Sequence, residues 1–227
     1  MSATLTVLRA RARQRADMPA TDFIADDATG IDAFINEGCQ ILHEKLVSAF
    51  ESEYVSVSTT LTTSASGQIS LPADFYKLYS VDMTIAGRVR TLLPYMRAER
   101  NAYRNIVGTT MVPRYRVEGG TTALPSAGYI KILPVPATGT SVSITYAPQH
   151  TVLVNGSDNF GCPNGWERYV VLYTAIQMLV KEESDVSQLR IELEKMEDQL
   201  KELALNRNAD QPARVIDMDL ALEDGWW

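Results

Sequence analysis

The sequence predicts an α+β protein with a four-helix bundle built from both chain ends, an inserted antiparallel β subdomain and an extended C-terminal arm. Apolar side chains recur every three or four positions near both ends of the 227 residues, which is the helical period. In the middle of the chain they recur at every second position, which is the strand period. We therefore assign residues 1–53 and 160–207 to the bundle, 54–149 to the β subdomain, 150–159 to a connecting loop and 208–227 to the arm.

The first predicted helix runs from about Thr4 to Ala16, with Leu5, Leu8 and Ala12 on one side. It also carries four arginines with no acidic residue among them, Arg9, Arg11, Arg13 and Arg15. Because they occupy every second position, they cannot share one helical face. They form either a solvated surface or a docking site for acidic side chains or DNA phosphate. A longer helix is predicted over residues 29–52, where the three- and four-residue steps continue.

Between the helical halves, alternating runs such as 55–61 and 142–146 predict about six short strands. Their turn signals contain four glycines, Gly67, Gly87, Gly119 and Gly139. Most prolines of this region lie at the ends of the alternating segments or inside short ones, which favours edge strands and corners over a long central sheet. One short helix is expected to interrupt the strands over residues 96–106.

The second helical half begins with a helix over about residues 166–180, and Ser184 or Asp185 is expected to cap the helix that follows. That last helix has the spacing of a heptad seam, formed by Val186, Leu189, Leu193, Met196, Leu200 and Leu203. At under three heptads, the pattern is more typical of a helix packed in an antiparallel bundle than of a coiled coil.

The predicted arm, residues 208–227, holds five acidic residues against one arginine, so it carries −4 of the chain's net charge of −7. Pro212 discourages continuation of the preceding helix. The arm is either a frayed terminus or a docking segment, and its two final tryptophans favour docking because indoles bury large areas at interfaces. The candidate contacts are Arg214, Ile216, Leu220, Leu222, Trp226 and Trp227.

Several classes of protein are disfavoured by composition. No apolar run approaches the roughly 18 residues of a membrane span, and the N-terminus lacks a signal-peptide pattern, so we expect a soluble protein made in a cytoplasm. Cys39 and Cys162 lack metal-ligand spacing and are interpreted as packing residues. The net negative charge argues against a general nucleic-acid binder.

Catalytic motifs are also missing from the sequence. It contains no phosphate-binding glycine loop, GxSxG elbow or HExxH motif. His43 and His150 have no motif partner and are interpreted as structural. We therefore expect no catalytic residue, cofactor or metal site, and no enzyme activity.

Four further segments are informative, in order along the chain: residues 8–18 (LRARARQRADM), 71–78 (LPADFYKL), 166–171 (WERYVV) and 181–187 (KEESDVS). Together they resemble the head-to-tail adaptor proteins of tailed bacteriophages, of the tail tubular protein A type. The resemblance implies a structural virion protein that is located in the neck after assembly in the host bacterial cytoplasm. It also implies a homo-oligomeric ring of twelve copies that joins the portal protein to a tail or nozzle protein. Genomic DNA would pass through this ring without sequence-specific binding and without any membrane partner.

The resemblance also implies an orientation for the chain. The helical bundle would lie under the portal, the C-terminal arm would reach onto the portal, and the β subdomain would face the tail through the turns at its four glycines. The arginines of the first helix would face an acidic neighbour such as the portal.

Two alternatives come from other functional classes. A DNA-binding regulator would dimerise through the heptad helix and contact DNA with the arginine-rich helix, and it would bind duplex DNA with a steep salt dependence. A hydrolase or carbohydrate-active enzyme would need a concave site with titratable residues of perturbed pKa.

Overall fold

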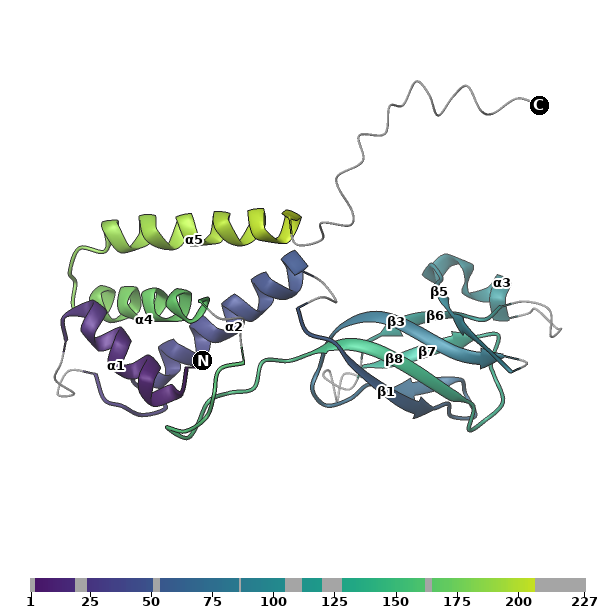
Figure 1. Ribbon diagram of the computed structural model, residues 1–227. Coiled ribbons are helices and arrows are strands. Elements are labelled where there is room, and N and C mark those ends of the chain that lie inside the picture. The colour runs from purple at the N-terminus through teal and green to yellow at the C-terminus, as the bar shows by residue number, and fades with distance from the viewer. Residues whose placement is uncertain are drawn as a thin grey trace, which may run out of the picture. The chain divides into compact units, whose positions relative to one another are not determined.

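The computed structural model describes residues 3–18, 24–50, 54–85, 87–104, 112–119, 128–161 and 165–206. The chain divides into two compact units (Figure 1). The helical unit contains residues 1–49 and 152–227, and the β unit contains residues 50–151. Both ends of the chain thus belong to one unit, and the β unit is an insertion between them.

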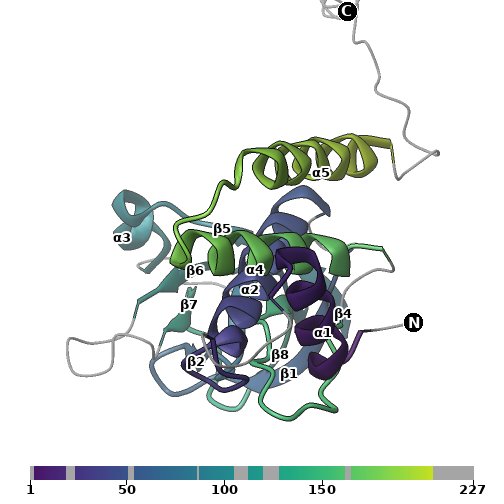
Figure 2. The same cartoon turned by 90° about the vertical axis from the view of Figure 1, so that its left-hand side faces the viewer.

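The helical unit contains four described helices, α1 (Leu5–Ala16), α2 (Ile31–Phe50), α4 (Glu167–Lys181) and α5 (Ser187–Asn206). α4 is central, because α1 and α5 both pack against it and its side chains are buried on most sides (Figure 2). α2 approaches α4 closely at Gly38, where an added Cβ would lie 3.0 Å from the Tyr173 ring. The four helices therefore share one core, whereas the regular geometry of a four-helix bundle stays a prediction.

Local hydrogen bonds define where two of these helices begin. Asp27 accepts from the backbone N–H of Thr29 and Gly30 before α2, at 2.9 and 2.8 Å. Asp185 accepts from the Ser187 N–H at 2.9 Å before α5, as the sequence predicts. Hydrogen bonds from Thr29 and Ser187 lower the pKa of the two carboxyl groups, because they favour the charged form.

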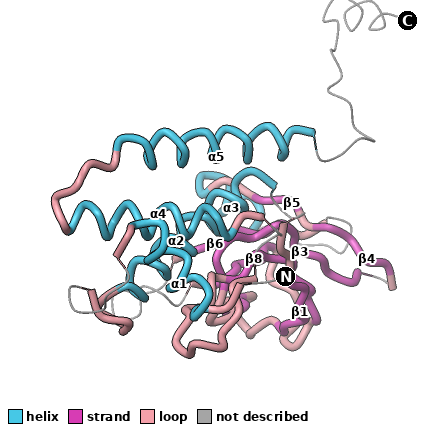
Figure 3. The backbone as a smooth tube through the Cα atoms, turned by 60° about the vertical axis from the view of Figure 1, so that its left-hand side comes forward, coloured by secondary structure: helices cyan, strands magenta, loops and turns pink. Residues whose placement is uncertain are grey.

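The β unit consists of two four-stranded sheets that share one apolar core. Figure 3 shows the strands in magenta and the helices in cyan. The first has the order β1-β8-β3-β4 and the second the order β2-β7-β6-β5. The strands are β1 (Val57–Thr62), β2 (Gln68–Ser70), β3 (Phe75–Ile85), β4 (Arg88–Thr91), β5 (Leu93–Pro94), β6 (Arg114–Glu118), β7 (Tyr129–Leu133) and β8 (Ser141–Pro148). Inward residues alternate along β3 and β8, as in Val81 and Met83, and meet Ile130 and Ile132 of β7.

The β unit differs from the prediction in two respects. It contains eight described strands rather than about six, and it is not wholly antiparallel, because β5 pairs in parallel with β6. The cause lies between them, where a 3-10 turn, η2 (Arg97–Glu99), continues into α3 (Arg100–Arg104). A helical crossover returns the chain in the same direction, which a tight turn cannot do. The predicted helix over 96–106 is therefore present, although residues 105 and 106 lie outside the described residues.

Candidate interaction surfaces

Three of the four arginines of α1 have acidic partners within their own chain. Arg9 makes two hydrogen bonds of 2.6 Å to the two carboxylate oxygens of Asp32 in α2. This pairing raises the pKa of Arg9, chiefly through the hydrogen bond to Asp32. Arg13 is buried and contacts Asp26 at 2.6 Å and the Ile24 carbonyl at 2.5 Å.

A third arginine of α1 ties this helix to α5. Arg15 donates to both carboxylate oxygens of Glu192 at 2.6 Å, and Arg168 of α4 reaches the same carboxylate at 3.2 Å. Burial opposes the charged form of Glu192, but the two guanidinium groups outweigh it and lower the pKa of the carboxyl group. Of the four predicted docking arginines, only Arg11 is exposed without an ion pair to a described carboxylate.

These pairs give three of the arginines acidic partners inside the helical unit. The partners lie in α2, in α5 and in the loop before α2, so Arg9, Arg13 and Arg15 hold the helical unit together. A regulator that read DNA with this helix would have to break these pairs first. Contacts of the four arginines with another protein stay a prediction.

The heptad seam of α5 is buried within the chain along only part of its length. Met196 and Leu200 are buried, whereas Leu203 is 54% exposed. The buried part packs toward α4, where the Tyr169 hydroxyl donates to Glu197 at 3.0 Å. Burial and the adjacent Glu197 charge raise the pKa of Tyr169. Met196 and Leu200 are therefore not available for dimerisation of a regulator, and only the end of the seam at Leu203 is exposed.

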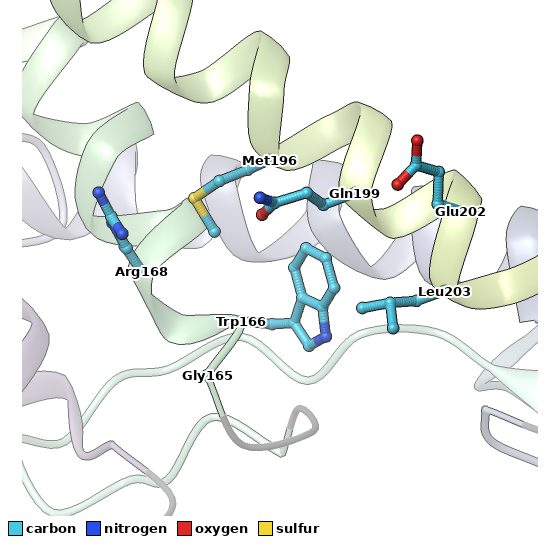
Figure 4. Close-up of a pocket in the computed structure, with 7 residues that line it drawn as sticks. All are labelled: Gly165, Trp166, Arg168, Met196, Gln199, Glu202 and Leu203. Carbon is cyan, nitrogen blue, oxygen red and sulfur yellow. The ribbon is translucent and has the colours of Figure 1, made fainter. Parts of the chain in front are cut away.

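A groove of about 530 Å³ lies where the seam leaves the core (Figure 4). Its lining comes from the start of α4 and the last part of α5, and consists of Gly165, Trp166, Arg168, Met196, Gln199, Glu202 and Leu203. The Trp166 indole lies beneath α5, between Met196 and Leu203. The groove has the chemistry to accept an apolar side chain beside charged neighbours.

Three of the four predicted loop glycines lie at one end of the first sheet. The register places Thr62 opposite Ser141 and Met83 opposite Val142, so the turns at Gly67, Gly87 and Gly139 follow or precede strands at the same end. The chain enters β1 and leaves β8 at the opposite end.

The fourth glycine is separated from this group. Gly119 follows Glu118, which pairs with Tyr129, and Tyr129 also pairs with Ser70. Gly119 therefore lies at the opposite end of the second sheet from Gly67, which precedes Gln68. Only Gly67, Gly87 and Gly139 form one group of loops, which we call the turn end of the β unit.

A basic stretch of the β unit was missed by the sequence analysis. Residues 88–131 contain eight lysines and arginines and two acidic residues, although the whole chain has a net charge of −7. Arg88, Arg90, Arg97, Arg100 and Arg104 are exposed and form no ion pair with a described carboxylate. A local charge count would have shown this reversal of sign.

This basic stretch is interleaved with aromatic and apolar residues. The Arg114 guanidinium lies 5.2 Å from the centre of the Tyr103 ring. A hollow of about 420 Å³ is lined in part by Arg100, Arg104 and Lys131. Val89, Leu93 and Met96 are exposed nearby in sequence. Arginine and exposed apolar residues together are typical of a protein interface.

The remaining predicted contacts lie outside the described residues: Arg214, Ile216, Leu220, Leu222, Trp226 and Trp227. Cys39 and His43 are buried in α2, and Cys162 also lies outside the described part. Among the described residues, no three His, Cys, Asp or Glu side chains gather as metal ligands. None of the described helices combines the length and the apolar content that crossing a membrane requires.

The comparison with protein families identifies the class of protein. The family model described as SU10 adaptor protein matches residues 3–216, which include all described parts of both units. The chain therefore belongs to the SU10 adaptor protein family. This family implies a bacteriophage head-to-tail adaptor, a structural protein of the virion neck rather than an enzyme. No curated protein matches the chain.

Proposed function

We propose that this adaptor forms a closed ring, of twelve copies, which joins the portal protein to a tail or nozzle protein around the channel for genomic DNA. The observation that carries the proposal is the family match across nearly the whole chain, from α1 through the β unit and α5. The narrower likeness to the tail tubular protein A type is part of the same proposal.

A ring of identical copies needs two different lateral surfaces on each copy, because a head-to-tail contact repeated by rotation closes on itself. The two units supply surfaces of opposite charge. The basic stretch of the β unit contrasts with the helical unit, which includes most of the chain's acidic residues. Charge complementarity of this kind favours one register of association.

We assign the portal side to the helical unit and the tail side to the turn end of the β unit. The turn end is remote from the two connections to the helical unit, so its loops are available to a second partner. Loops tolerate variation without loss of the scaffold, which suits a partner that differs between phages. The end of the predicted arm, residues 224–227, would bind the portal, with Trp226 and Trp227 as anchors.

The net charge of −7 supports free passage of the genome. A basic channel would hold DNA through phosphate contacts, whereas an acidic one lets the duplex slide. Assembly in the host bacterial cytoplasm follows from this role.

Electron microscopy of the chain mixed with its portal protein tests the proposal. We expect a ring of density on the portal, with copies related by rotation. A single bound copy, or no added density, would refute the ring. Deleting residues 224–227 should weaken portal binding while the circular dichroism stays unchanged, because the deletion removes both tryptophans and starts beyond α5. Unchanged binding would show that these residues do not contact the portal.

A further inference from the structure

The outer edge of β4 has no neighbouring strand among the described residues. β4 ends the first sheet, where it pairs with β3 alone, from Arg88 opposite Ile85 to Thr91 opposite Asp82. All four of its residues are exposed, and Val89 is 73% exposed. Backbone N–H and C=O groups on such an edge can pair with another extended segment.

The register assigns the side chains of β4 to two faces. Arg90 lies opposite the buried Met83, so Arg88 and Arg90 are on the inner face of the sheet, beyond the limit of its core. Val89 and Thr91 are on the outer face, where the Thr91 hydroxyl donates to Asp82 at 2.6 Å. A strand that pairs with this edge therefore needs acids on one face and apolar residues on the other.

One segment of this chain has that pattern. Residues 216–223, which lie outside the described part, read Ile-Asp-Met-Asp-Leu-Ala-Leu-Glu. Ile216 and every second residue after it are apolar, and the positions between them are acidic except for Ala221. Alternation of this kind, broken only at Ala221, is typical of a strand with two different faces.

We propose that residues 216–223 of one copy add a strand to the edge of β4 in the neighbouring copy. Asp217 and Asp219 would lie beside Arg88 and Arg90, and the apolar residues between and after them would lie beside Val89. The proposal rests on the ring described above. Each copy then has one donor segment in the helical unit and one acceptor edge in the β unit, as a head-to-tail ring requires.

The arginines of β4 also determine which strands can pair with this edge. Charged residues on an edge strand prevent pairing with an identical edge, because like charges would be opposed. An acidic strand escapes that repulsion, so Arg88 and Arg90 reject a second β4 and accept residues 216–223. The other edge of the sheet, β1, has the sequence VSTTLT and no charge, so it offers no counterpart to the acids.

Disulfide crosslinking of the full-length chain tests the pairing. In a background with Cys39→Ala and Cys162→Ala, Val89→Cys is combined with one cysteine at each position from 216 to 223. Directly opposed side chains in paired strands have Cβ atoms about 4.5–5.5 Å apart. We expect crosslinks between copies, strong for Met218→Cys or Leu220→Cys and weak for Asp217→Cys and Asp219→Cys.

Charge reversal then identifies the cause of the pairing. Arg88→Glu with Arg90→Glu should reduce crosslinking between copies about tenfold, because two attractive pairs become repulsive. Adding Asp217→Arg and Asp219→Arg should restore it. The matched control is Arg100→Glu with Arg104→Glu, which makes the same charge change on α3 and should have little effect.

Four other outcomes would overturn the inference, and a fifth would refute the ring alone. Crosslinks only within one chain would exclude the neighbouring copy, and crosslinks without alternation would exclude a paired strand. An equal loss of crosslinking in the α3 control would show that the overall positive charge of the β unit attracts the segment, without specific pairs to Arg88 and Arg90. A ring seen by microscopy without these crosslinks would refute the strand and leave the adaptor ring intact, whereas crosslinked open chains would do the reverse.

Discussion

Replacing Arg9 with methionine removes one partner of an ion pair and leaves the Asp32 carboxylate without its bidentate neighbour. The Asp32 side chain is 7% exposed and the Arg9 side chain 20% exposed. Breaking a fully buried pair costs about 3–5 kcal/mol. Water reaches Asp32 more easily here, and the first turn of α2 favours a negative charge, so we expect a loss of about 2–3 kcal/mol. For a unit of this size, that loss lowers the Tm by about 8–12 °C.

The assay is thermal unfolding followed by circular dichroism at a helical wavelength. Arg11→Met in the same helix is the matched control, because Arg11 is exposed, and it should change the stability by less than about 0.5 kcal/mol. The double variant Arg9→Met with Asp32→Asn should lose less stability than the sum of the two single variants, because it leaves no unpaired carboxylate at position 32. Equal melting of Arg9→Met and Arg11→Met would refute a structural role for the pair.

Three further predictions concern burial, backbone conformation and pH. Leu200→Ala should cost about 2–4 kcal/mol in urea unfolding, and Leu203→Ala under about 1 kcal/mol, because only Leu200 is buried; similar losses would place both in the core. Gly67→Ala should destabilise the β unit more than Gly139→Ala, by about 1–2 kcal/mol. Both have positive φ, but only at Gly67 would a Cβ meet a carbonyl oxygen, at 3.0 Å, so equal losses would contradict the close contact. Burial raises the pKa of Tyr173 to about 12. The neutral Tyr173 side chain therefore contributes to folding stability below pH 10, where the side chain is also neutral in the unfolded state. This contribution is lost between pH 10 and 12, because there the unfolded side chain ionises first. In the Tyr173→Phe variant, the free energy of unfolding should fall less between pH 10 and 12 than in the parent protein. An equal fall in both proteins would show that Tyr173 does not contribute.

The helices and the inserted β unit could be predicted because their signals are local. Residues three or four apart on one helical face reveal α1, and the described structure buries Leu5, Leu8 and Ala12 together. The cap at Asp185 is equally local, since it depends on a side chain and an N–H two residues away. Such features need no knowledge of what packs against them.

What the sequence could not predict is contacts between distant residues. Arg15 and Glu192 are 177 positions apart, so no spacing rule could pair them. The parallel pairing of β5 with β6 depends on how a short crossover returns the chain, and a two-residue strand leaves almost no pattern. The heptad spacing correctly marks an apolar seam, but only the tertiary packing decides that Met196 is buried and Leu203 is not.

The two arginine-rich segments of this chain show why charge must be considered together with its surroundings. In α1 the pattern suggested a docking surface, yet three of the arginines are neutralised by acids of the helical unit, and they link α1 to α2, α5 and the loop before α2. In β4 and α3 the arginines are equally numerous but exposed, with no described carboxylate as a partner. An ion pair already satisfied within a chain has little to offer a partner, because binding would first have to break it. Among the described residues, the unpaired arginines of this adaptor are therefore concentrated in β4 and α3 of the β unit, and a partner with acidic residues should bind there.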